Sequence, residues 1–325
     1  MSVRNAFILI LLSFSGASQS IPVAWQADQA HFSECEKTIK IQSDSADFEV
    51  REALLSTRFP TLEYLKNEID IQYTYDSNWF GQTDPIVLIR HCSQGRVVTS
   101  ILKTGVNEGD FRKARDGDIW DKLKLAIQTP YVALYRKDLL RVYNLARRRH
   151  KIFGQGDVAF FDLAETMVCH ILDADLRAMP CRDTTEKGYI NTFNHVTAQA
   201  FVTTFFSEQL ADFIADSHER FYLPELISGD FTKRQLHDIE NNPIDNYVDI
   251  VNNEWGQELG KRLKKKYGIR HSTQWNASLM TAYLNDIQQY FAWSFDLQFL
   301  PFQETDEVVV KFSNKINRVM KTAPL

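Results

Sequence analysis

The sequence predicts a mainly α-helical protein, with a multi-helix bundle domain over residues 106–325 preceded by a small, disulfide-bearing α+β region over residues 21–105. From about Asp116 onward, apolar residues recur at helical spacing, and capping residues and prolines separate the segments. Before Gly105, short β-branched and aliphatic runs alternate with turn residues, which is typical of strands. A hydrophobic content of 44% over 325 residues is that of a globular chain and excludes a disordered or fibrous protein.

The charge balance argues against nucleic acid as a partner. With 37 Lys+Arg against 42 Asp+Glu, the formal net charge is -5. A mildly acidic chain binds polyanions poorly, because phosphates are held mainly by clustered basic residues. We therefore expect no nucleic-acid partner.

Residues 1–20 are typical of a secretory signal peptide. Arg4 supplies the positive charge, Ala6–Phe14 is a short apolar run, and small residues follow it over positions 15–20. The apolar run is about half of the roughly 20 residues that a membrane-spanning helix needs, and no later window approaches that length. We expect a secreted protein, periplasmic or extracellular, with no transmembrane segment after signal cleavage.

Four cysteines agree with an oxidising compartment, where an even set favours disulfides. Three pairings are open. We favour Cys35 with Cys92 and Cys169 with Cys181, because each pair then lies within one of the two regions.

The elements of the first region follow from their local patterns. Ile69–Tyr75 alternates polar and apolar residues as a half-buried strand does. Ile86–Arg90 and Arg96–Leu102 are β-branched and aliphatic, and residues 93–95 (Ser-Gln-Gly) between them predict a hairpin. Asp47–Phe59 has the spacing of a short helix.

The second region predicts a series of helices. Asp118 can cap a helix through Ile127, and Pro130 fits the first turn of a helix to about His150. Further helices are expected over Val158–Ala178, Asn191–Ser207, Glu208–Phe221, Ile244–Tyr267 and Ala277–Phe295. Glu307–Met320 leaves helix and strand open, because it contains three consecutive valines.

The most informative polar pattern lies on the predicted helix from Ile244. Asp249, then Asn252 or Asn253, and then Gly256 share one face, while apolar residues fill much of the remaining circumference. A helix with such broad apolar cover is substantially buried, and buried carboxylates and amides need partners. We therefore expect other polar groups to face this stripe.

Two earlier helices offer those groups. His195 lies in an otherwise apolar helix, with Gln199 one turn later on the same face. His218 and Glu219 lie near the end of the next helix, but adjacent helical residues diverge by about 100°, so a regular helix cannot point both the same way.

Two chemistries fit these residues. In a metal centre, His195, His218 and Asp249 supply two imidazoles and an oxygen ligand to a divalent ion such as zinc, with water in an open position. Glu219 is the alternative oxygen ligand. In a metal-free site, Glu219 or Asp249 acts as general acid or base, and His218 orients or protonates the reacting group. The candidate substrate-binding residues are Asn252, Asn253, Gly256 and Gln199.

A third interpretation needs no chemistry. Buried polar networks often hold helices together without catalysis. His195, Asp249 and the asparagines would then satisfy one another across the bundle, and the protein would be a non-catalytic envelope binding or structural module.

Three motifs follow one another over residues 185–262: N-x-F-x-H, A-D-S-H-E-R and D-I-V-N-N-E-W-G. In this order they resemble an uncharacterised helical domain of bacterial secreted and wall-associated proteins. Its signature is H…HE…D-x-x-N-N-x-x-G. The resemblance implies a shared polar site in an α-helical domain and brings no established reaction. Together with the expected export, the resemblance favours a hydrolase that acts on a cell-envelope component. The alternative of a non-catalytic module stays open, so the sequence does not decide whether the protein is an enzyme.

Overall fold

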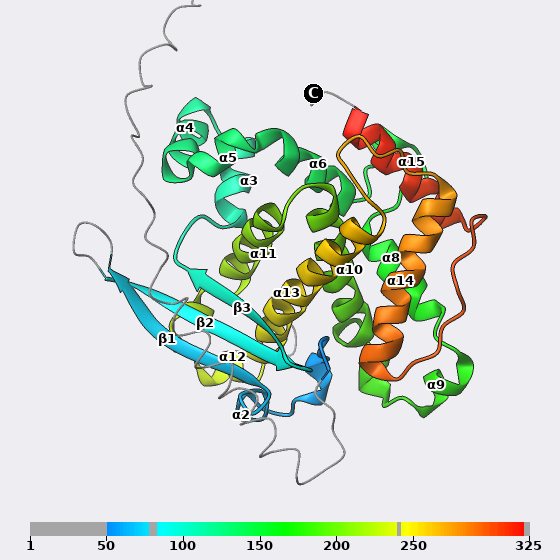
Figure 1. The fold of residues 1–325 in the computed structure, drawn as a ribbon. Helices are drawn as coiled ribbons and strands as arrows, with labels where there is room; N and C mark the ends of the chain where they lie inside the picture. The colour runs from blue at the N-terminus through cyan, green and yellow to red at the C-terminus, as the bar shows by residue number, and fades with distance from the viewer. Residues whose placement is uncertain (1–50, 78–82, 239–241, 322–325) are drawn as a thin grey trace, which may run out of the picture. The chain divides into compact units, whose positions relative to one another are not determined.

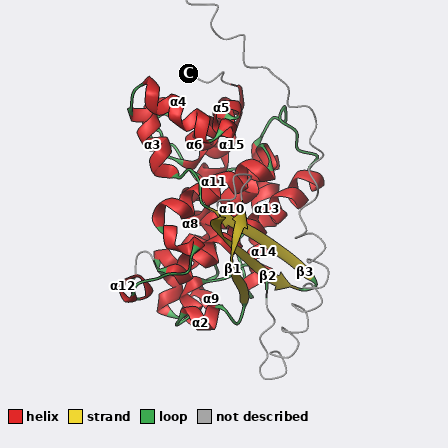
Figure 2. Ribbon diagram, turned by 90° about the vertical axis from the view of Figure 1, so that its left-hand side faces the viewer, coloured by secondary structure: helices red, strands yellow, loops and turns green. Residues whose placement is uncertain are grey.

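Helices make up most of the described chain, and its strands form one three-stranded antiparallel sheet (Figure 1 and Figure 2). The computed structural model describes residues 51–77, 83–238 and 242–321. All of these residues belong to one unit by their contacts. The predicted signal peptide lies outside the described residues. Within the described ranges, no helix is both long enough and apolar enough to cross a membrane.

The sheet is built from three consecutive strands, β1 (Ile69–Ser77), β2 (Thr83–Ser93) and β3 (Arg96–Lys103), in the order β1-β2-β3. Gln94 and Gly95 join β2 to β3 with φ angles of 47° and 73°. A two-residue turn of type I′ requires positive φ at both positions. The predicted hairpin and the predicted strand before it are therefore confirmed.

The sheet shares its core with α13 (Pro243–Lys266). Val87 of β2 and Trp255 of α13 are fully buried in the same apolar cluster. Further along α13, Leu259 belongs to a second cluster formed with the other helices. The change of sequence pattern near residue 105 is thus a change from strands to helices within one unit.

The helix predicted over Asp47–Phe59 is wrong for the part that the structure describes. Only the 3₁₀ turn η1 (Ser56–Arg58) is helical there. The backbone N–H of Leu54 donates to Oδ1 of Asn252 (2.9 Å), and its C=O accepts from Nδ2 of the same side chain (3.0 Å). Because a side chain of α13 satisfies both backbone groups, the segment is held without helical hydrogen bonds.

The other helices follow the predicted order, with more breaks than predicted. Those before α13 are α2 (Leu62–Leu65), α3 (Glu108–Asp116), α4 (Ile119–Gln128), α5 (Pro130–Leu134), α6 (Arg136–Ala146), α7 (His150–Phe153), α8 (Phe160–Cys169), α9 (Asp173–Ala178), α10 (Asn191–Phe205), α11 (Glu208–Tyr222) and α12 (Lys233–Leu236). After α13 come α14 (Ala277–Phe295) and α15 (Glu307–Lys321). Two 3₁₀ turns, η2 (Cys181–Thr184) and η4 (Pro224–Ile227), and a π turn, η3 (Glu186–Ile190), lie between helices.

Two predicted long helices are interrupted. The segment Pro130–His150 divides into α5, α6 and the start of α7, and Arg147 takes an extended backbone after α6 (φ -131°, ψ 143°). The segment Val158–Ala178 divides into α8 and α9. Between them the N–H of Leu172 donates to the C=O of Gln298 (2.9 Å). A tertiary hydrogen bond replaces the helical one at this break.

The C-terminal segment, for which the sequence left helix and strand open, is the helix α15. Val309, Phe312, Ile316 and Val319 are all buried. Their spacing of three and four residues gives one apolar face, which packs into the helical core. The secondary structure of this segment therefore follows the helical spacing of its buried residues and not the β-propensity of the three consecutive valines.

Helices α10 and α13 run parallel and in close contact. A Cβ on Gly256 would lie 2.7 Å from the backbone oxygen of Val196, and a Cβ on Gly260 would lie 2.5 Å from that of Ala200. These contacts advance along both helices together, which makes the two helices parallel. The glycines let the two backbones approach each other more closely than any larger residue allows.

One predicted disulfide is wrong. Cys169 and Cys181 are both free and exposed. Cys169 ends α8 and Cys181 begins η2, and α9 occupies the chain between them. Cys35 lies outside the described residues, so its pairing with Cys92 stays a prediction.

Candidate functional site

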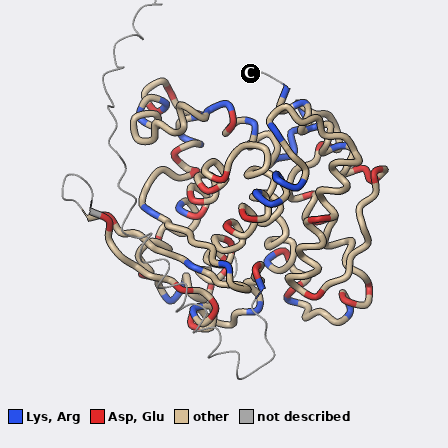
Figure 3. Tube along the Cα trace, in the orientation of Figure 1, with Lys and Arg blue, Asp and Glu red and all other residues tan. Residues whose placement is uncertain are grey.

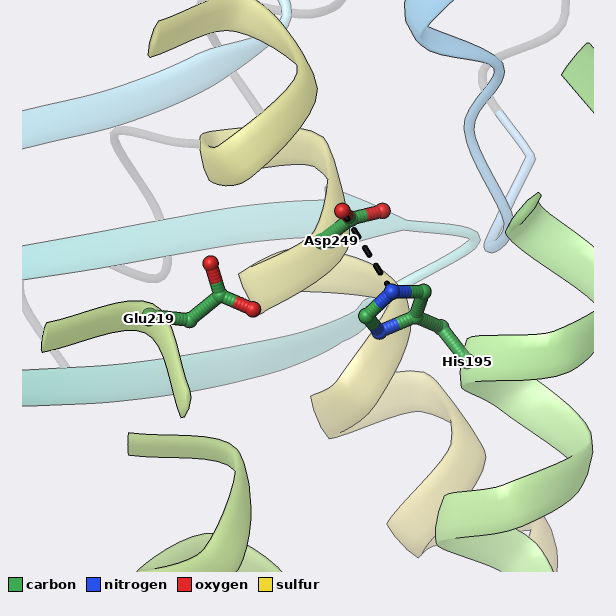
Figure 4. A group of neighbouring side chains, drawn as sticks. All are labelled: His195, Glu219 and Asp249. Atoms are coloured by element: carbon green, nitrogen blue, oxygen red, sulfur yellow. Dashed lines mark ion pairs between the residues drawn. The ribbon is translucent and has the colours of Figure 1, made fainter. Parts of the chain in front are cut away.

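Three side chains from three helices meet in the candidate site: His195 of α10, Glu219 of α11 and Asp249 of α13 (Figure 4). A ligand atom of each lies within 4.8 Å of those of the other two. The short connection between α10 and α11 explains why the first two meet. His195 precedes the last residue of α10 by ten positions (205 − 195), and Glu219 follows the first residue of α11 by eleven (219 − 208). At 1.5 Å per residue, both lie about 15 Å from the turn.

Helix α13 adds the third group because it runs parallel to α10. Asp245, Asp249 and Asn253 follow one another at intervals of four, so they lie on one stripe of the helix. His195 reaches two of them. Its Nδ1 lies 3.0 Å from Oδ1 of Asn253, and its Nε2 lies 3.4 Å from Oδ2 of Asp249.

Asn253 fixes the tautomer of His195. The Oδ1 atom of Asn253 can only accept, so Nδ1 of the imidazole donates to it. A neutral imidazole then presents the lone pair of Nε2 to the Asp249 carboxylate. Two acceptors in this position require a proton or a cation between them. His195 is therefore oriented as a metal ligand or as a proton acceptor.

A second layer of hydrogen bonds holds the α13 carboxylates in place. Nδ2 of Asn191 donates to Oδ1 of Asp249 (2.9 Å). One turn earlier, Asp245 accepts from Nζ of Lys187 (2.6 Å) and from Oγ of Ser56 (2.8 Å). Asp245 is thus fully paired, whereas Asp249 still faces the imidazole with its other oxygen.

In the part of the chain that the structure describes, Glu219 has no counter-charge in contact. Its side chain is buried, with the residue 2% exposed, and Oε1 has no hydrogen-bond partner within the described residues. Burial raises the pKa of this carboxyl well above its usual range, and nearby carboxylates, that of Asp249 first, raise it further against the opposing effect of Lys187. A buried, unpartnered carboxylate is costly, so a proton or a cation must neutralise it.

The neighbouring carboxyl groups are perturbed in the same direction. Burial raises the pKa of Asp249 to about 7, although the nearby His195 lowers it. Burial and the neighbouring Asp212 raise the pKa of Asp216 to about 7, against a hydrogen bond from Arg220 (3.1 Å). The interface of α11 and α13 therefore holds more carboxyl groups than its cations neutralise.

We expect the metal-free protein to melt at a higher temperature at pH 5 than at pH 8. Asp249 and Asp216 ordinarily have a pKa of 3.8 and in the folded protein one of about 7. Between about pH 4 and pH 7 the folded state therefore binds more protons than the unfolded state, and stability falls as the pH rises. Thermal denaturation in the presence of a chelator should show a difference on the order of 5 °C. A melting temperature that rises across this interval would contradict this description.

Asn252 and Gly256 have structural contacts. Both polar atoms of the Asn252 side chain bond to the backbone of Leu54, and the residue is fully buried. Gly256 is covered by α10 at Val196. The expected substrate-binding role is therefore not supported for these two residues, because their contacts with the protein already occupy them.

The other two expected substrate-binding residues lie closer to the cluster. Asn253 orients His195, so it supports a site residue. Gln199 lies one turn beyond His195 and is 7% exposed, and its Oε1 has no partner in the described part of the chain. Gln199 thus keeps a free acceptor next to the site.

His218 does not join the cluster. Its Nδ1 lies 3.1 Å from Oε2 of Glu108, its ring packs against Tyr222, and its side chain is 45% exposed. Because α11 is regular here, His218 points about 100° away from Glu219. The structure therefore does not bring His218 together with His195, as the sequence analysis expected, and Glu219 lies with His195 and Asp249 instead.

Four residues around the cluster were not predicted: Asn191, Lys187, Asp216 and Asp245. The two aspartates precede the site carboxylates by three and four positions, a spacing that places them on the same helix faces and was visible in the sequence. Lys187 lies in the π turn before α10, where no helical period points to a partner.

Comparisons with protein-family models, with curated proteins and with solved structures find no match. The chemistry of the site therefore follows from its own donor set. One imidazole and two carboxylates from three helices can bind a divalent cation, or can share protons at neutral pH.

Proposed function

We propose that this protein is a metal-dependent hydrolase whose divalent ion is bound by His195, Glu219 and Asp249. The observation that carries the proposal is the buried Oε1 of Glu219, which has no partner among the described residues and belongs to a carboxylate grouped with an imidazole and a second carboxylate. A divalent cation neutralises both carboxylates and removes the cost of burying them.

The ligand set and its spacing support a transition-metal site. Zinc binds nitrogen and oxygen ligands at about 2.0–2.2 Å, so two ligands of a tetrahedral ion lie about 3.3–3.5 Å apart. The separation of 3.4 Å between Nε2 of His195 and Oδ2 of Asp249 fits this requirement. Three protein ligands leave a position for water, which is the arrangement of catalytic rather than structural sites.

The ion would supply the chemistry of hydrolysis by lowering the pKa of a bound water and polarising the bond that is broken. The residues around it have supporting tasks. Asn253 holds the tautomer of His195, and Asn191 orients Asp249. The side chain of His195 is 16% exposed and that of Asp249 is 10% exposed, so both side chains remain in part accessible to solvent.

The substrate class and the location rest on the sequence. The signal-like residues 1–20 support export, to the periplasm or the extracellular space. The resemblance of residues 185–262 to a helical domain of secreted and wall-associated proteins supports a cell-envelope component as substrate. No nucleic-acid partner is proposed, in keeping with the net charge of -5.

A second candidate is a non-catalytic envelope module in which the cluster is a structural network. The contacts of Asn252 and Asp245 favour it, since both side chains tie the segment around Leu54 and Ser56 to α13. In that case Glu219 stays protonated and no ion binds.

Metal retention separates the two candidates. Protein dialysed against zinc or manganese and then desalted is expected to retain about one ion per chain by elemental analysis. His195→Ala and Glu219→Gln are expected to lose it. Binding should also release protons from the carboxyl groups, which calorimetry in buffers of different ionisation enthalpy detects.

The matched control is His218→Ala, which removes an imidazole from α11 outside the cluster and should keep the ion. Hydrolysis is then followed on purified envelope fractions by the appearance of new amino or reducing ends. Folded wild-type protein that retains no ion, or a His218→Ala variant that loses it, would refute the metal site.

A further inference from the structure

Helix α4 exposes a row of large apolar side chains. Ile119, Trp120 and Ile127 are 75%, 72% and 71% exposed, and Leu123 is also exposed. At about 100° per residue, these four positions fall within an arc of about 100° on one side of the helix. We call them the α4 patch. Helix α4 lies beside α3 and α5 and contributes no residue to the His195 cluster (Figure 2).

Two lysines border the α4 patch on the helix. Lys122 and Lys124 are exposed and lie on either side of the apolar arc, and neither forms an ion pair within the described residues. Figure 3 marks the charged positions along the chain.

The acidic residues of α4 do not belong to the patch. Asp118 caps the helix by accepting from the N–H groups of Trp120 and Asp121. Asp121 lies on the opposite side of the helix and pairs with Lys113 (3.7 Å). Leu125, also on the far side, is buried, so α4 is anchored to the protein by one face and exposes the other.

The geometry points to the α4 patch as a docking surface for an anionic phospholipid membrane. An isoleucine, leucine and tryptophan face with lysines along its borders is the pattern of a helix that lies in the membrane interface. The apolar arc enters the boundary of the acyl chains, the tryptophan takes its preferred interfacial position, and the lysines reach the acidic headgroups.

The unpaired charges favour a membrane over a protein partner. A second copy of this chain offers apolar surface but carries a formal net charge of only -5 over 325 residues. An acidic bilayer offers an apolar layer directly beneath a dense layer of negative charge, which matches lysines on both sides of an apolar arc. The proposal is independent of the metal site, since it uses other residues.

Vesicle sedimentation tests the proposal. The probe is the chain from Ile21, the form that signal cleavage is expected to leave, with vesicles of phosphatidylcholine alone or with added phosphatidylglycerol. We expect binding to the acidic vesicles, weak binding to the neutral ones, and weaker binding at high salt. Partitioning should fall about tenfold or more in Ile119→Ser/Ile127→Ser and in Lys122→Glu/Lys124→Glu.

Matched controls carry the same changes elsewhere. Leu300 is 55% exposed, so Leu300→Ser removes an exposed apolar side chain outside the patch, and Lys233→Glu/Lys265→Glu reverses two exposed lysines on other helices. Both should bind like the wild type and melt at the same temperature. Absence of binding to acidic vesicles, or equal loss in the controls, overturns the proposal. If the wild type is a dimer, and Ile119→Ser/Ile127→Ser makes it monomeric without changing vesicle binding, the patch binds a second copy of the chain and the membrane proposal is overturned.

Discussion

Replacing Glu219 by glutamine is expected to abolish the proposed metal-dependent hydrolysis and at the same time to raise the melting temperature of the metal-free protein at pH 8. Glutamine keeps the shape of the side chain and removes the charge that burial opposes. Loss of one of three ligands should weaken metal binding by more than about 100-fold, since loss of an outer-shell residue alone costs about 10–100-fold. The gain in melting temperature should be on the order of 5 °C.

The difference in melting temperature between wild type and Glu219→Gln should depend on pH and on metal, and this dependence is the control for the prediction. As the pH falls towards 4.5, the ordinary pKa of this carboxyl, the unfolded state also takes up the proton, so the difference between wild type and variant should shrink. Metal at 100 times its Kd stabilises the wild type by about 2.7 kcal/mol and leaves the variant unchanged, so the order of melting temperatures reverses. If Glu219→Gln instead lowers the metal-free melting temperature at pH 8, the carboxylate is a structural group and the metal site is refuted.

A methyl group at Gly260 is expected to destabilise the protein by about 3 kcal/mol. The added Cβ would lie 2.5 Å from the backbone oxygen of Ala200 and 2.9 Å from Cβ of Thr203. Neither neighbour can move aside like the end of a flexible side chain, so α10 and α13 must separate. The gain of about 1 kcal/mol in helix propensity offsets only part of this cost.

Chemical denaturation of Gly260→Ala measures this effect, and Gly105→Ala is the matched control. A Cβ on Gly105 would meet only the Arg220 side chain, at 3.7 Å, which is an ordinary contact. We expect the control to unfold like the wild type. His195 and Asp249 lie on the same two helices, α10 and α13. Separation of these helices in Gly260→Ala should therefore also weaken metal retention. Unchanged stability would mean that the two backbones are not in close contact.

Much of the fold could be predicted from local pattern. The boundaries of α14 follow from the apolar period of three and four residues, and the β2–β3 hairpin follows from the Ser-Gln-Gly turn between two β-branched and aliphatic runs. The breaks at Arg147 and after His170 could not be predicted, since tertiary hydrogen bonds such as that between Leu172 and Gln298 compete with helical ones. Likewise, the backbone of Leu54 is satisfied by a side chain far along the sequence.

The candidate site was predictable where helix geometry decides. The stripe of α13 and the position of His195 on α10 follow from spacing, and the structure brings Glu219 to them. The sequence left open which of His218 and Glu219 faces inward, because that depends on how α11 is rotated against α13. In the structure, His218 pairs with Glu108 and Glu219 faces inward. No local sequence pattern predicts Glu108 as the partner of His218.

The bonds between Leu54 and Asn252 join positions 198 residues apart. Contacts of such long sequence separation make folding slow, because the entropy of closing the loop is lost before the contacts compensate for it. A chain that emerges with its N-terminus first has neither Asn252 nor Asp249 available until about three quarters of it has been made. The segment around Leu54 must therefore wait unpaired, and the acidic cluster assembles only at a late stage of folding.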